Sequence, residues 1–393
     1  MTLELAAKIV FWSSAAAVLY AYLGYPLLLV LAGRVRRREV RRAACEPPVT
    51  VIITAYNEER DLAAKLENTL ALDYPRAKLE VIVASDCSTD ATDDIARRFA
   101  ARGVRLHRQP RRLGKTAAQN AAVELARGDV LLFSDATTLY RPDVLRAIVP
   151  NFADRTVGCV AGRLLYLDPA AEGSNVGRGA RAYWDYEVFI KERESRVNSL
   201  IGVSGCLYAV RRAAYVPLYH EACSDFIIAT KMVEQGLRAV YEPAAVCTEE
   251  TNRRPGKEFR MRVRVITQTI SDLARHRAML NPLRGGFYAV QLLSHKVARY
   301  LVPFFLLAAF ASSAWLAPRS LFYAAAFAAQ VCFYLAAGLS WALARAGVES
   351  RLLSLPQYFV LANVAAVVAL YEFVRGERYA SWEPAREPAK PAA

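Results

Sequence analysis

The chain has no Cys-x-x-Cys pair, and its cysteines are odd in number. Its seven cysteines are Cys45, Cys87, Cys159, Cys206, Cys223, Cys247 and Cys332. Because structural zinc sites and secreted disulfide frameworks use paired cysteines, neither kind of structure is indicated. Reduced thiols in a cytosolic domain are the simplest prediction.

Acidic residues are scarce relative to basic ones. The sequence has 37 Asp and Glu against 51 Lys and Arg, which gives a net charge of +14. Much of this excess stands in "RVRRREVRR", residues 34–42, directly after a long uncharged run. A basic flank against anionic lipid headgroups explains the charge, so no nucleic-acid partner is predicted.

That uncharged run covers residues 9–32 and predicts a transmembrane helix. About 24 residues at a rise of about 1.5 Å each span roughly 36 Å, enough to cross a bilayer core. A signal peptide is the alternative, but the run is too long and its basic residues follow it. By the positive-inside rule, the N-terminus lies outside and the next domain lies in the cytoplasm.

Three more uncharged or nearly uncharged segments follow in the C-terminal third, at 300–317, 321–345 and 352–374. They predict three further membrane helices, an odd number that would place the C-terminus outside. The basic residues Arg375, Arg378 and Arg386 favour a cytoplasmic C-terminus instead. The alternative is therefore that one of the three segments is interfacial or re-entrant and does not cross the membrane.

The sequence therefore predicts a multi-pass protein of a bacterial-type inner (plasma) membrane with a cytoplasmic catalytic domain. "GGFYAVQLLSHKVAR", residues 285–299, fits an interfacial amphipathic helix or the first turns of the next membrane helix. The predicted parts are an anchor at 1–34, a cytosolic domain at 46–280, an interfacial helix at 285–299, membrane helices at 300–375 and a polar tail at 376–393.

Between the membrane segments, short apolar runs alternate with helical patterns. The runs at 49–54, 79–85 and 130–135 predict strands, and the patterns at 58–71, 90–102 and 115–127 predict helices. This alternation predicts an α/β fold with a mixed, mainly parallel sheet that is covered on both faces. Ligands of such sheets bind at the carboxyl ends of the strands.

Polar side chains follow each of these three runs. They are Asn57, Glu58 and Glu59 after the first run, Asp86, Ser88 and Asp90 after the second, and Asp135 at the end of the third. Each acid alone fits a helix N-cap, and for Asp90 that interpretation is favoured. Acids at three neighbouring strand ends together favour a nucleotide site.

Six ordered motifs give the chain a family resemblance. They are "VTVIITAYNEE", "VIVASDCSTDAT", "RLGKTAAQNAA", "LLFSDATT", "VSGCLYAVRR" and "SDFIIATKMVEQGLRAVYEP". In this order and spacing they resemble the inverting family 2 glycosyltransferases, which have a GT-A fold related to the Rossmann fold. The membrane segments are similar to those of the hyaluronan, cellulose and poly-N-acetylglucosamine synthases, and the resemblance covers about residues 9–375.

The resemblance implies a nucleotide-sugar donor and assigns its contacts. Asp86 would bind the base, most often uracil, and Asn57 and Glu58 would line the nucleotide pocket. Lys115 would lie near the nucleotide or the acceptor, although a solvated helix start explains a lysine there equally well.

The family's Asp-x-Asp motif, which binds Mg²⁺ or Mn²⁺ on the donor diphosphate, is Asp-Ala-Thr here. Asp135 stands at its first position and the uncharged Thr137 at its last. A threonine hydroxyl can bind such a cation or a water on it, so we expect metal binding that depends on the diphosphate. Loss of the metal site is the alternative.

The resemblance also implies a catalytic base and a diphosphate-binding arginine. Asp225 in "CSDFIIA" is the expected base, with capping of helix 226–236 as the alternative. In "FRMRVRVITQ", which matches the family's Gln-x-x-Arg-Trp element, Arg264 keeps the arginine expected to stabilise the leaving diphosphate. Met261 and Val265 replace the glutamine and the tryptophan, and a solvated helix face explains Arg260 and Arg262 equally well.

The expected function is sugar transfer from a nucleotide sugar, UDP-linked by the resemblance, to a glycan or lipid-linked acceptor. Membrane lipids are expected partners, and export or assembly proteins are possible ones. The missing tryptophan favours a single addition over processive synthesis, whereas the several C-terminal spans favour a synthase with an export channel. An inactive assembly subunit, suggested by Thr137 alone, is the third hypothesis. Tyr183, Trp184 and Tyr186 are candidates for stacking on a sugar or for core packing.

Overall fold

The computed structural model describes residues 2–166, 175–249, 255–346, 348 and 350–380. Arg386 and residues 381–393 of the predicted tail lie outside this range. The domain between the membrane segments contains an eight-stranded mixed sheet of order β3-β2-β1-β4-β7-β6-β8-β5. Its strands are β1 Val49–Ala55, β2 Leu79–Ser85, β3 Val104–Arg108, β4 Val130–Asp135, β5 Leu139–Tyr140, β6 Val157–Tyr166, β7 Tyr208–Arg211 and β8 Arg238–Glu249.

The three strands predicted from apolar runs are confirmed as β1, β2 and β4. β1 pairs in parallel with both of the others, and its register sets Thr54 beside Asp135 and Ala55 beside Ser85. Because parallel strands end at one edge of the sheet, this register brings the polar residues that follow them to the same edge.

Helices cover both faces of this sheet. Successive side chains of a strand point to opposite faces, so apolar residues on both faces need a covering layer. Val51 and Ile53 point into one core layer, which is covered by α3 (Leu62–Leu70), α4 (Thr92–Arg98) and α6 (Val144–Ile148). Ile52 points into the other layer, against α5 (Lys115–Leu125) and α8 (Ser224–Glu234).

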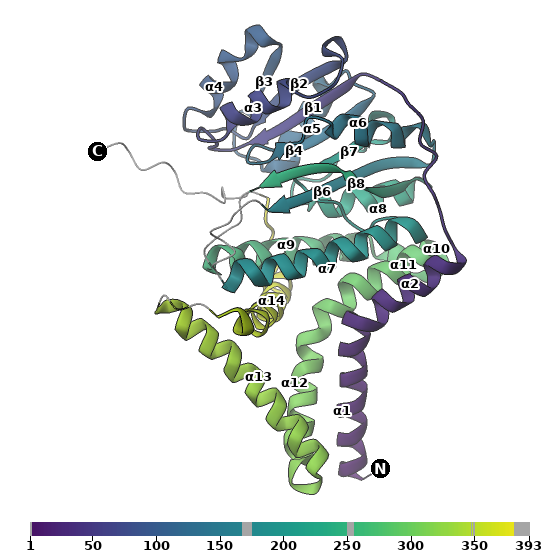
Figure 1. Ribbon diagram of the computed structural model, residues 1–393, viewed down its shortest axis with the longest axis vertical. Helices are drawn as coiled ribbons and strands as arrows, with labels where there is room; N and C mark the ends of the chain where they lie inside the picture. The colour runs from purple at the N-terminus through teal and green to yellow at the C-terminus, as the bar shows by residue number, and fades with distance from the viewer. Residues whose placement is uncertain (1, 167–174, 250–254, 347, 349, 381–393) are drawn as a thin grey trace.

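Two long helices, α7 (Asn175–Val197) and α9 (Pro255–Arg275), lie between the sheet and the apolar helices. Figure 1 shows them running across the base of the sheet domain, with the apolar helices extending away on the other side. The last apolar helix, α14 (Arg351–Val374), contacts both. The sheet domain is thus joined to the apolar helices through α7 and α9.

In the part of the chain that the structure describes, four helical segments are long and apolar enough to cross a membrane: Leu3–Val35, Phe287–Arg319, Leu321–Arg345 and Leu352–Val374. The first consists of α1 (Leu3–Leu19), the π-helical η1 (Tyr20–Gly24) and α2 (Tyr25–Val35). After α10 (Pro282–Gly285), the second consists of α11 (Phe287–Leu292), the π-helical η8 (Leu293–Val297) and α12 (Ala298–Leu316), and α13 (Leu321–Arg345) is the third.

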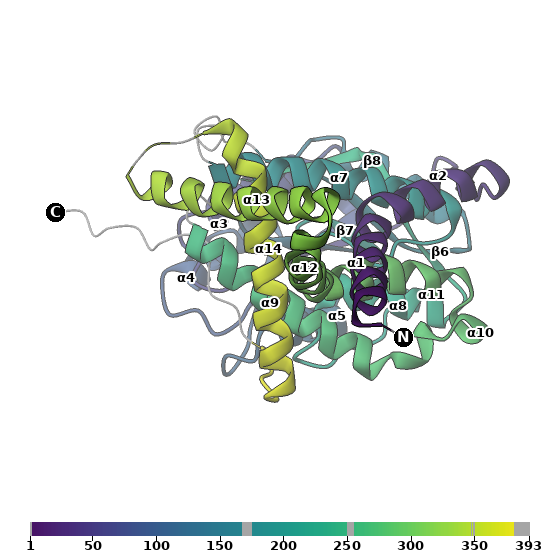
Figure 2. The same ribbon diagram turned by 90° about the horizontal axis from the view of Figure 1, so that it is seen from below.

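Residues 287–299 are thus continuous with the helix that follows them. Figures 1 and 2 show α1 and α12 side by side, and the two helices are in contact. By length and composition, these four segments indicate association with a membrane.

Candidate active site

The loops after β1 and β2 are hydrogen-bonded to each other. Asn57, with φ of 53°, accepts a hydrogen bond through Oδ1 from the backbone N–H of Thr89 (2.8 Å), and its own N–H donates to Ser88 Oγ (3.2 Å). The buried Glu58 donates its backbone N–H to Thr92 Oγ1 (2.7 Å). These contacts fix the two loops as one rigid edge. Asn57 and Glu58 stand on this edge, and their contact with a nucleotide stays a prediction.

Asp90 lies at the start of α4, where it accepts hydrogen bonds from the backbone N–H of Thr92 (3.0 Å) and from Glu59 (3.1 Å). The N-cap of α4 is Ala91, which makes no side-chain hydrogen bond, so Asp90 supports the start of the helix from one residue before the N-cap position.

Asp86 is fully buried, and both of its carboxylate oxygens accept backbone hydrogen bonds. Oδ1 accepts from the N–H of Leu113 (2.8 Å) and Oδ2 from the N–H of Gly114 (3.0 Å). Gly114, with φ of 97°, precedes the first residue of α5. Asp86 therefore holds the loop that positions Lys115. Base recognition by Asp86 stays a prediction.

Lys115, Asp135 and Asp225 converge around Gly205. The Nζ of Lys115 forms an ion pair with Asp135, and both side chains remain partly exposed, at 25% and 33%. A Cβ atom on Gly205 would lie 3.1 Å from Asp225 Oδ2 and 3.2 Å from Lys115 Nζ. A side chain at this position would crowd both charged groups, so only glycine leaves the space between them open.

The charge on Lys115 is stabilised by these acids. Burial acts to lower its pKa, but the carboxylates of Asp135 and Asp225 outweigh burial and raise it above the ordinary lysine value. The interpretation of Lys115 as a solvated helix start is therefore wrong. The structure brings together three of the residues singled out in the sequence: two acids and one cation.

Asp225 lies in the first turn of α8, which begins at Ser224. The cap of that helix makes no side-chain hydrogen bond, and Asp225 Oδ1 instead accepts from Cys223 Sγ (3.0 Å). The backbone carbonyl of Asp225 accepts from the N–H of Val203 (2.7 Å), which ties the Gly205 loop to α8. The capping alternative for Asp225 does not hold, because its carboxylate faces the cluster.

Behind Asp225 lies a second buried carboxylate that sequence reasoning missed. Asp272 of α9 accepts hydrogen bonds from the backbone N–H of Cys223 (3.1 Å) and from the Tyr219 hydroxyl. Burial raises the pKa of Asp272 to about 7, although both hydrogen bonds act to lower it. The residue precedes no turn and matches no motif, so no local signal identified it.

Thr137 lies beside a carboxylate from the far end of the sheet. Its Oγ1 donates a hydrogen bond to Glu249 Oε1 (2.9 Å), and Glu249 is the last residue of β8. Beneath them, the fully buried Lys65 packs its Nζ 3.3 Å from the centre of the Tyr140 ring. Among the described residues this Nζ has no hydrogen-bond partner.

The two arginines of the altered Gln-x-x-Arg-Trp element lie in different surroundings. Arg262 donates to Glu258 Oε1 (2.8 Å), bonds the Tyr358 hydroxyl and lies 4.8 Å from the Tyr183 ring centre. The solvated-face interpretation is therefore wrong for Arg262, whereas Arg260 is exposed. Arg264 lies in a different environment, near Tyr379.

Near Arg264, burial and Glu372 raise the pKa of Tyr379 to about 12, and Arg264 acts in the opposite direction. A contact of Arg264 with a diphosphate stays a prediction. Of the three aromatic candidates, Trp184 donates to Leu164 O (3.1 Å) and packs against the core, and Tyr186 donates to Tyr22 O (2.7 Å). These contacts are those of packed side chains.

A buried ionic network joins α7 to the membrane-facing helices. His295 contacts Glu194 through Nδ1 (2.7 Å) and Glu187 through Nε2 (3.1 Å), and Arg299 forms an ion pair with Glu187. Tyr25 from the first apolar segment donates to Glu194 Oε1 (2.5 Å). The two segments with π-helical turns therefore meet at the sheet side of the apolar helices.

The same helix α7 reaches the cluster. Lys191 Nζ donates to Ser204 Oγ (2.9 Å), the residue next to Gly205. The apolar helices and the loop around Gly205 are therefore linked through α7.

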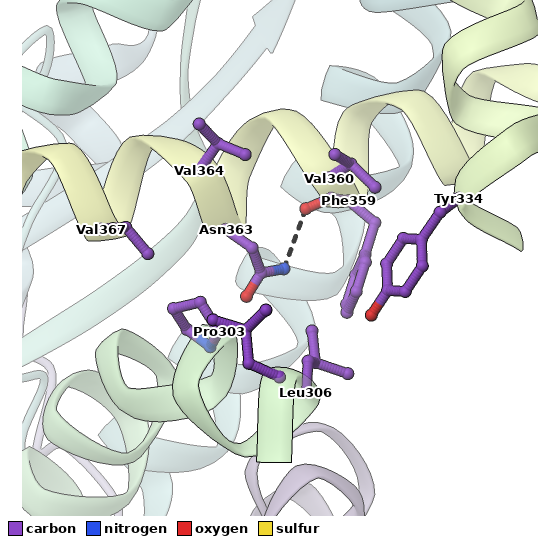
Figure 3. Close-up of a pocket in the computed structure, with 9 residues that line it drawn as sticks. Pro303, Leu306, Tyr334, Phe359, Val360, Asn363, Val364 and Val367 are labelled. Carbon is purple, nitrogen blue, oxygen red and sulfur yellow. Dashed lines mark hydrogen bonds between the residues drawn. The ribbon is translucent and has the colours of Figure 1, made fainter. Parts of the chain in front are cut away.

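A cavity of about 160 Å³ lies among α12, α13 and α14. Figure 3 shows its lining, in which the rings of Phe359 and Tyr334 lie side by side, and the other lining residues include Leu306 and Val364. The amide of Asn363 donates to Phe359 O (2.8 Å), so its polar group is partly satisfied within its own helix. The lining suits a hydrocarbon chain better than a sugar, which needs polar partners for its hydroxyls.

Comparison with known families gives a match over part of the domain. Residues 50–216 match the glycosyl transferase family 2 model. The chain is 27% identical over 215 residues to the beta-monoglucosyldiacylglycerol synthase of Nostoc sp., covering 53% of this chain and 46% of that protein. It is 26% identical to the poly-beta-1,6-N-acetyl-D-glucosamine synthase of Staphylococcus aureus, covering 55% of this chain and 53% of that protein. The chain thus spans about half the length of these relatives.

Among solved structures, the mannosyltransferase PcManGT from Pyrobaculum calidifontis, in complex with GDP-Man and Mn²⁺, is similar to nearly the whole chain. The TM-score is 0.72 at 25% identity, covering 93% of this chain and 99% of that one. This likeness confirms the predicted GT-A fold, including apolar helices that flank the sheet domain.

Proposed function

We propose that this chain transfers one sugar from a nucleotide sugar to an acceptor carried by a membrane lipid. Its residues 50–216 match glycosyl transferase family 2, and its sheet domain has the GT-A fold. The convergence of Lys115, Asp135 and Asp225 around Gly205 carries this proposal. In such a cluster Asp135 can bind a metal ion, Lys115 can bind a diphosphate, and Asp225 can accept the proton of a hydroxyl group.

The donor side lies at the carboxyl ends of β1, β2 and β4. In this proposal Asn57 and Glu58 line the nucleotide pocket, and the fully buried Asp86 holds the loop at its rim. UDP is the nucleotide expected from the family motifs, and the similar Pyrobaculum enzyme was crystallised with GDP-Man. Both nucleotides therefore belong in the assay.

The oxygen donors at this edge fit a hard divalent cation such as Mg²⁺ or Mn²⁺, which takes few protein ligands when a diphosphate completes its shell. Asp135 and the hydroxyl of Thr137 would hold it. Bound with the donor, such a cation neutralises charge on the leaving diphosphate. Among the described residues no group of three or more His, Cys, Asp or Glu could hold a metal alone, in keeping with a site that the donor completes.

Asp225 takes the proton of the acceptor hydroxyl as that oxygen attacks the anomeric carbon from the face opposite the diphosphate, which inverts the configuration. Its place in the first turn of α8 directs its Oδ2 toward the space at Gly205. Lys115 keeps a positive charge beside the departing diphosphate, and Arg264 adds a second one.

The acceptor reaches this space from the membrane side. Ser204 and Gly205 are tied through Lys191 to α7, whose Glu187 and Glu194 contact the apolar helices. The apolar cavity at α12–α14 suits the hydrocarbon part of a lipid, and Val265 at the tryptophan position removes a stacking surface for a long glycan. In this proposal the domain lies on the cytoplasmic side of an inner membrane that the chain crosses several times, and the arginines at 34–42 and the apolar helical segments support this arrangement.

The test incubates detergent-purified protein with UDP- and GDP-sugars and Mn²⁺, with and without bacterial lipid extract. We expect nucleotide release from one donor that depends on lipid, and a lipid product larger by one sugar. A ladder of products would instead indicate a processive synthase. Binding without release from any donor would indicate an inactive subunit.

A further inference from the structure

Another pocket, outside the candidate active site, lies between α2 and α7. Its volume is about 410 Å³. Figure 1 shows α2 on the side of α7 that faces the apolar helices, and the two helices are in contact. The lining combines four arginines with apolar side chains, and it includes Arg34, Arg37, Arg193, Arg196, Leu29 and Val30. None of the lining residues belongs to the cluster around Gly205.

Contacts between α2 and the end of α7 build this pocket from segments that are far apart in the sequence. The fully buried Leu29 packs in one apolar cluster with Ile190 of α7. After α2 ends, the backbone N–H of Arg38 donates to the carbonyl of Arg196 (2.8 Å), and Arg38 Nη1 donates to Asn198 Oδ1 (3.3 Å). These contacts hold the two helix ends together, so the arginines of both helices gather at one place.

Two of the four arginines have acid neighbours at long range. Arg193 Nη1 lies 3.7 Å from Glu192, and Arg37 Nε lies 4.0 Å from Glu39, in a pair whose side chains are both more than half exposed. Exposed ion pairs at such distances contribute little, because water screens them. The two acids therefore leave most of the positive charge available to a ligand.

The other two arginines, Arg34 and Arg196, are exposed and form no ion pair with any residue that the structure describes. The guanidinium groups of α7 also act on each other. Burial lowers the pKa of Arg193, and the charge of Arg196 acts in the same direction, whereas Glu192 acts to raise it. Like charges held this close repel each other, and a bound anion would remove that repulsion.

We propose that this pocket binds the headgroup phosphate of an anionic membrane phospholipid. Planar guanidinium groups match the oxygens of a phosphate and bind them through paired hydrogen bonds. Leu29 and Val30 belong to the first apolar segment, Leu3–Val35, so they offer the hydrocarbon part of the same lipid an apolar contact. A soluble phosphate would make no use of these two residues.

The basic segment 34–42 by itself would only attract the chain to an anionic surface. The arginines of α7 add a second wall, and together the two helices bind one lipid at a defined place. Lipid binding requires the membrane association that the apolar segments indicate, and it does not depend on the proposed reaction.

The alternative is that the arginines only stabilise the ends of two helices. Arg34 and Arg196 stand in the last turns of α2 and α7, where a cation offsets the partial negative charge of the helix end. That charge is about half an elementary charge per helix, which is less than the four positive charges gathered here. Under this alternative, the arginines would show no preference for a lipid headgroup.

Native mass spectrometry of the full chain in detergent tests the pocket. It compares the binding of anionic phosphatidylglycerol with that of phosphatidylcholine carrying the same acyl chains. We expect wild type to bind phosphatidylglycerol at least about tenfold more tightly. The double variant Arg34→Gln with Arg196→Gln should lose this preference, because it removes one arginine without an ion pair from each helix.

The matched control is the double variant Arg36→Gln with Arg41→Gln. It removes the same charge from exposed arginines of the segment 34–42 that do not line the pocket, so it should keep the preference of wild type. Equal losses in the two double variants overturn the proposal, because total charge and not the pocket would then determine binding. A pocket variant that keeps the preference overturns it as well.

Equal binding of the two lipids by wild type also overturns the proposal. If inorganic phosphate competes as well as phosphatidylglycerol does, the pocket takes a soluble anion and not a lipid. Should the glutamine variant fail to fold, Val30→Trp fills the pocket from its apolar side and keeps all four arginines, and wild-type binding by that variant counts against the proposal. Because no nucleotide sugar is present, none of these outcomes depends on the proposed function.

Discussion

Asp86 and Asp135 stand at the ends of the two strands that flank β1, yet the fold uses them differently. Asp86 is fully buried, and its oxygens accept from the N–H groups of Leu113 and Gly114. Asp135 is one-third exposed and pairs with the movable side chain of Lys115. One acid fixes a loop, and the other stays open to a ligand. Equal positions at a sheet edge therefore do not imply equal roles.

The largest expected effect concerns Asp225, which belongs to the same partly exposed cluster as Asp135. Asp225→Asn keeps the shape of the side chain and removes the base, so we expect sugar transfer to fall about 1000-fold with donor binding nearly unchanged. Single-turnover transfer and nucleotide titration check the two parts. Loss of nucleotide binding in the variant would mean that Asp225 has a structural role.

Asp86→Ala should lower the stability of the fold, because Asp86 is the buried acid that fixes a loop. It leaves two backbone N–H groups without their acceptor, and we expect a loss of about 3 kcal/mol in the free energy of unfolding. Asp135→Asn is the matched control and should unfold close to wild type, because its partner is a partly exposed lysine. Thermal unfolding of both variants in detergent measures the difference. Equal losses in the two variants would break the comparison.

Lys115→Met tests the lysine that pairs with Asp135 and directly follows the loop held by Asp86. The substitution leaves Asp135 and Asp225 without their shared positive charge, so we expect affinity for UDP or GDP with Mn²⁺ to fall about tenfold. Lys231→Met, which alters a partly exposed lysine paired with Glu234 outside the cluster, is the control and should have no effect. Isothermal titration with each nucleotide reports the change. A wild-type affinity in Lys115→Met would place the diphosphate elsewhere.

The last expected effect, the smallest per pH unit, concerns Asp272, behind the catalytic loop. Its pKa is raised from 3.8 to about 7, mainly by burial, so the folded state favours the protonated carboxyl. The stability that this proton contributes is present below about pH 4 and is lost as the pH rises through about 7.

Asp272→Asn removes this dependence. The stability of the variant relative to wild type should increase with pH between 4 and 7, by about 1 kcal/mol or less per pH unit. Unfolding midpoints of both proteins at pH 5, 6, 7 and 8 measure it. A difference that does not change with pH would show that Asp272 is charged throughout.

Much of the fold could be predicted from local patterns. The apolar runs that became β1, β2 and β4 are short, bounded by polar residues and separated by helical periodicity, so each one signals a buried parallel strand by itself. The antiparallel strand β7 and the long strand β8 gave no such signal. They are placed by pairing with distant strands, which a single sequence does not show.

The candidate site divides in the same way. Asp135 and Lys115 stand at element ends, where a sequence pattern can place them, and the fold joins them. A solvated helix face was an alternative for Arg262, but Tyr358 of α14 contacts it and its side chain is only 17% exposed. Asp272 and Lys65 had no local signal, because their surroundings consist of residues far away in the chain.

The sequence by itself determined that this protein has membrane-associated apolar helices around an α/β domain with acids at its strand ends, since hydrophobic period and run length are local properties. Only the tertiary structure decided which acids are available. The backbone N–H groups of the next loop engage Asp86, and the pairing of β5 with β8 brings Glu249 to Thr137. Both outcomes depend on contacts between distant segments, whose geometry no local pattern contains.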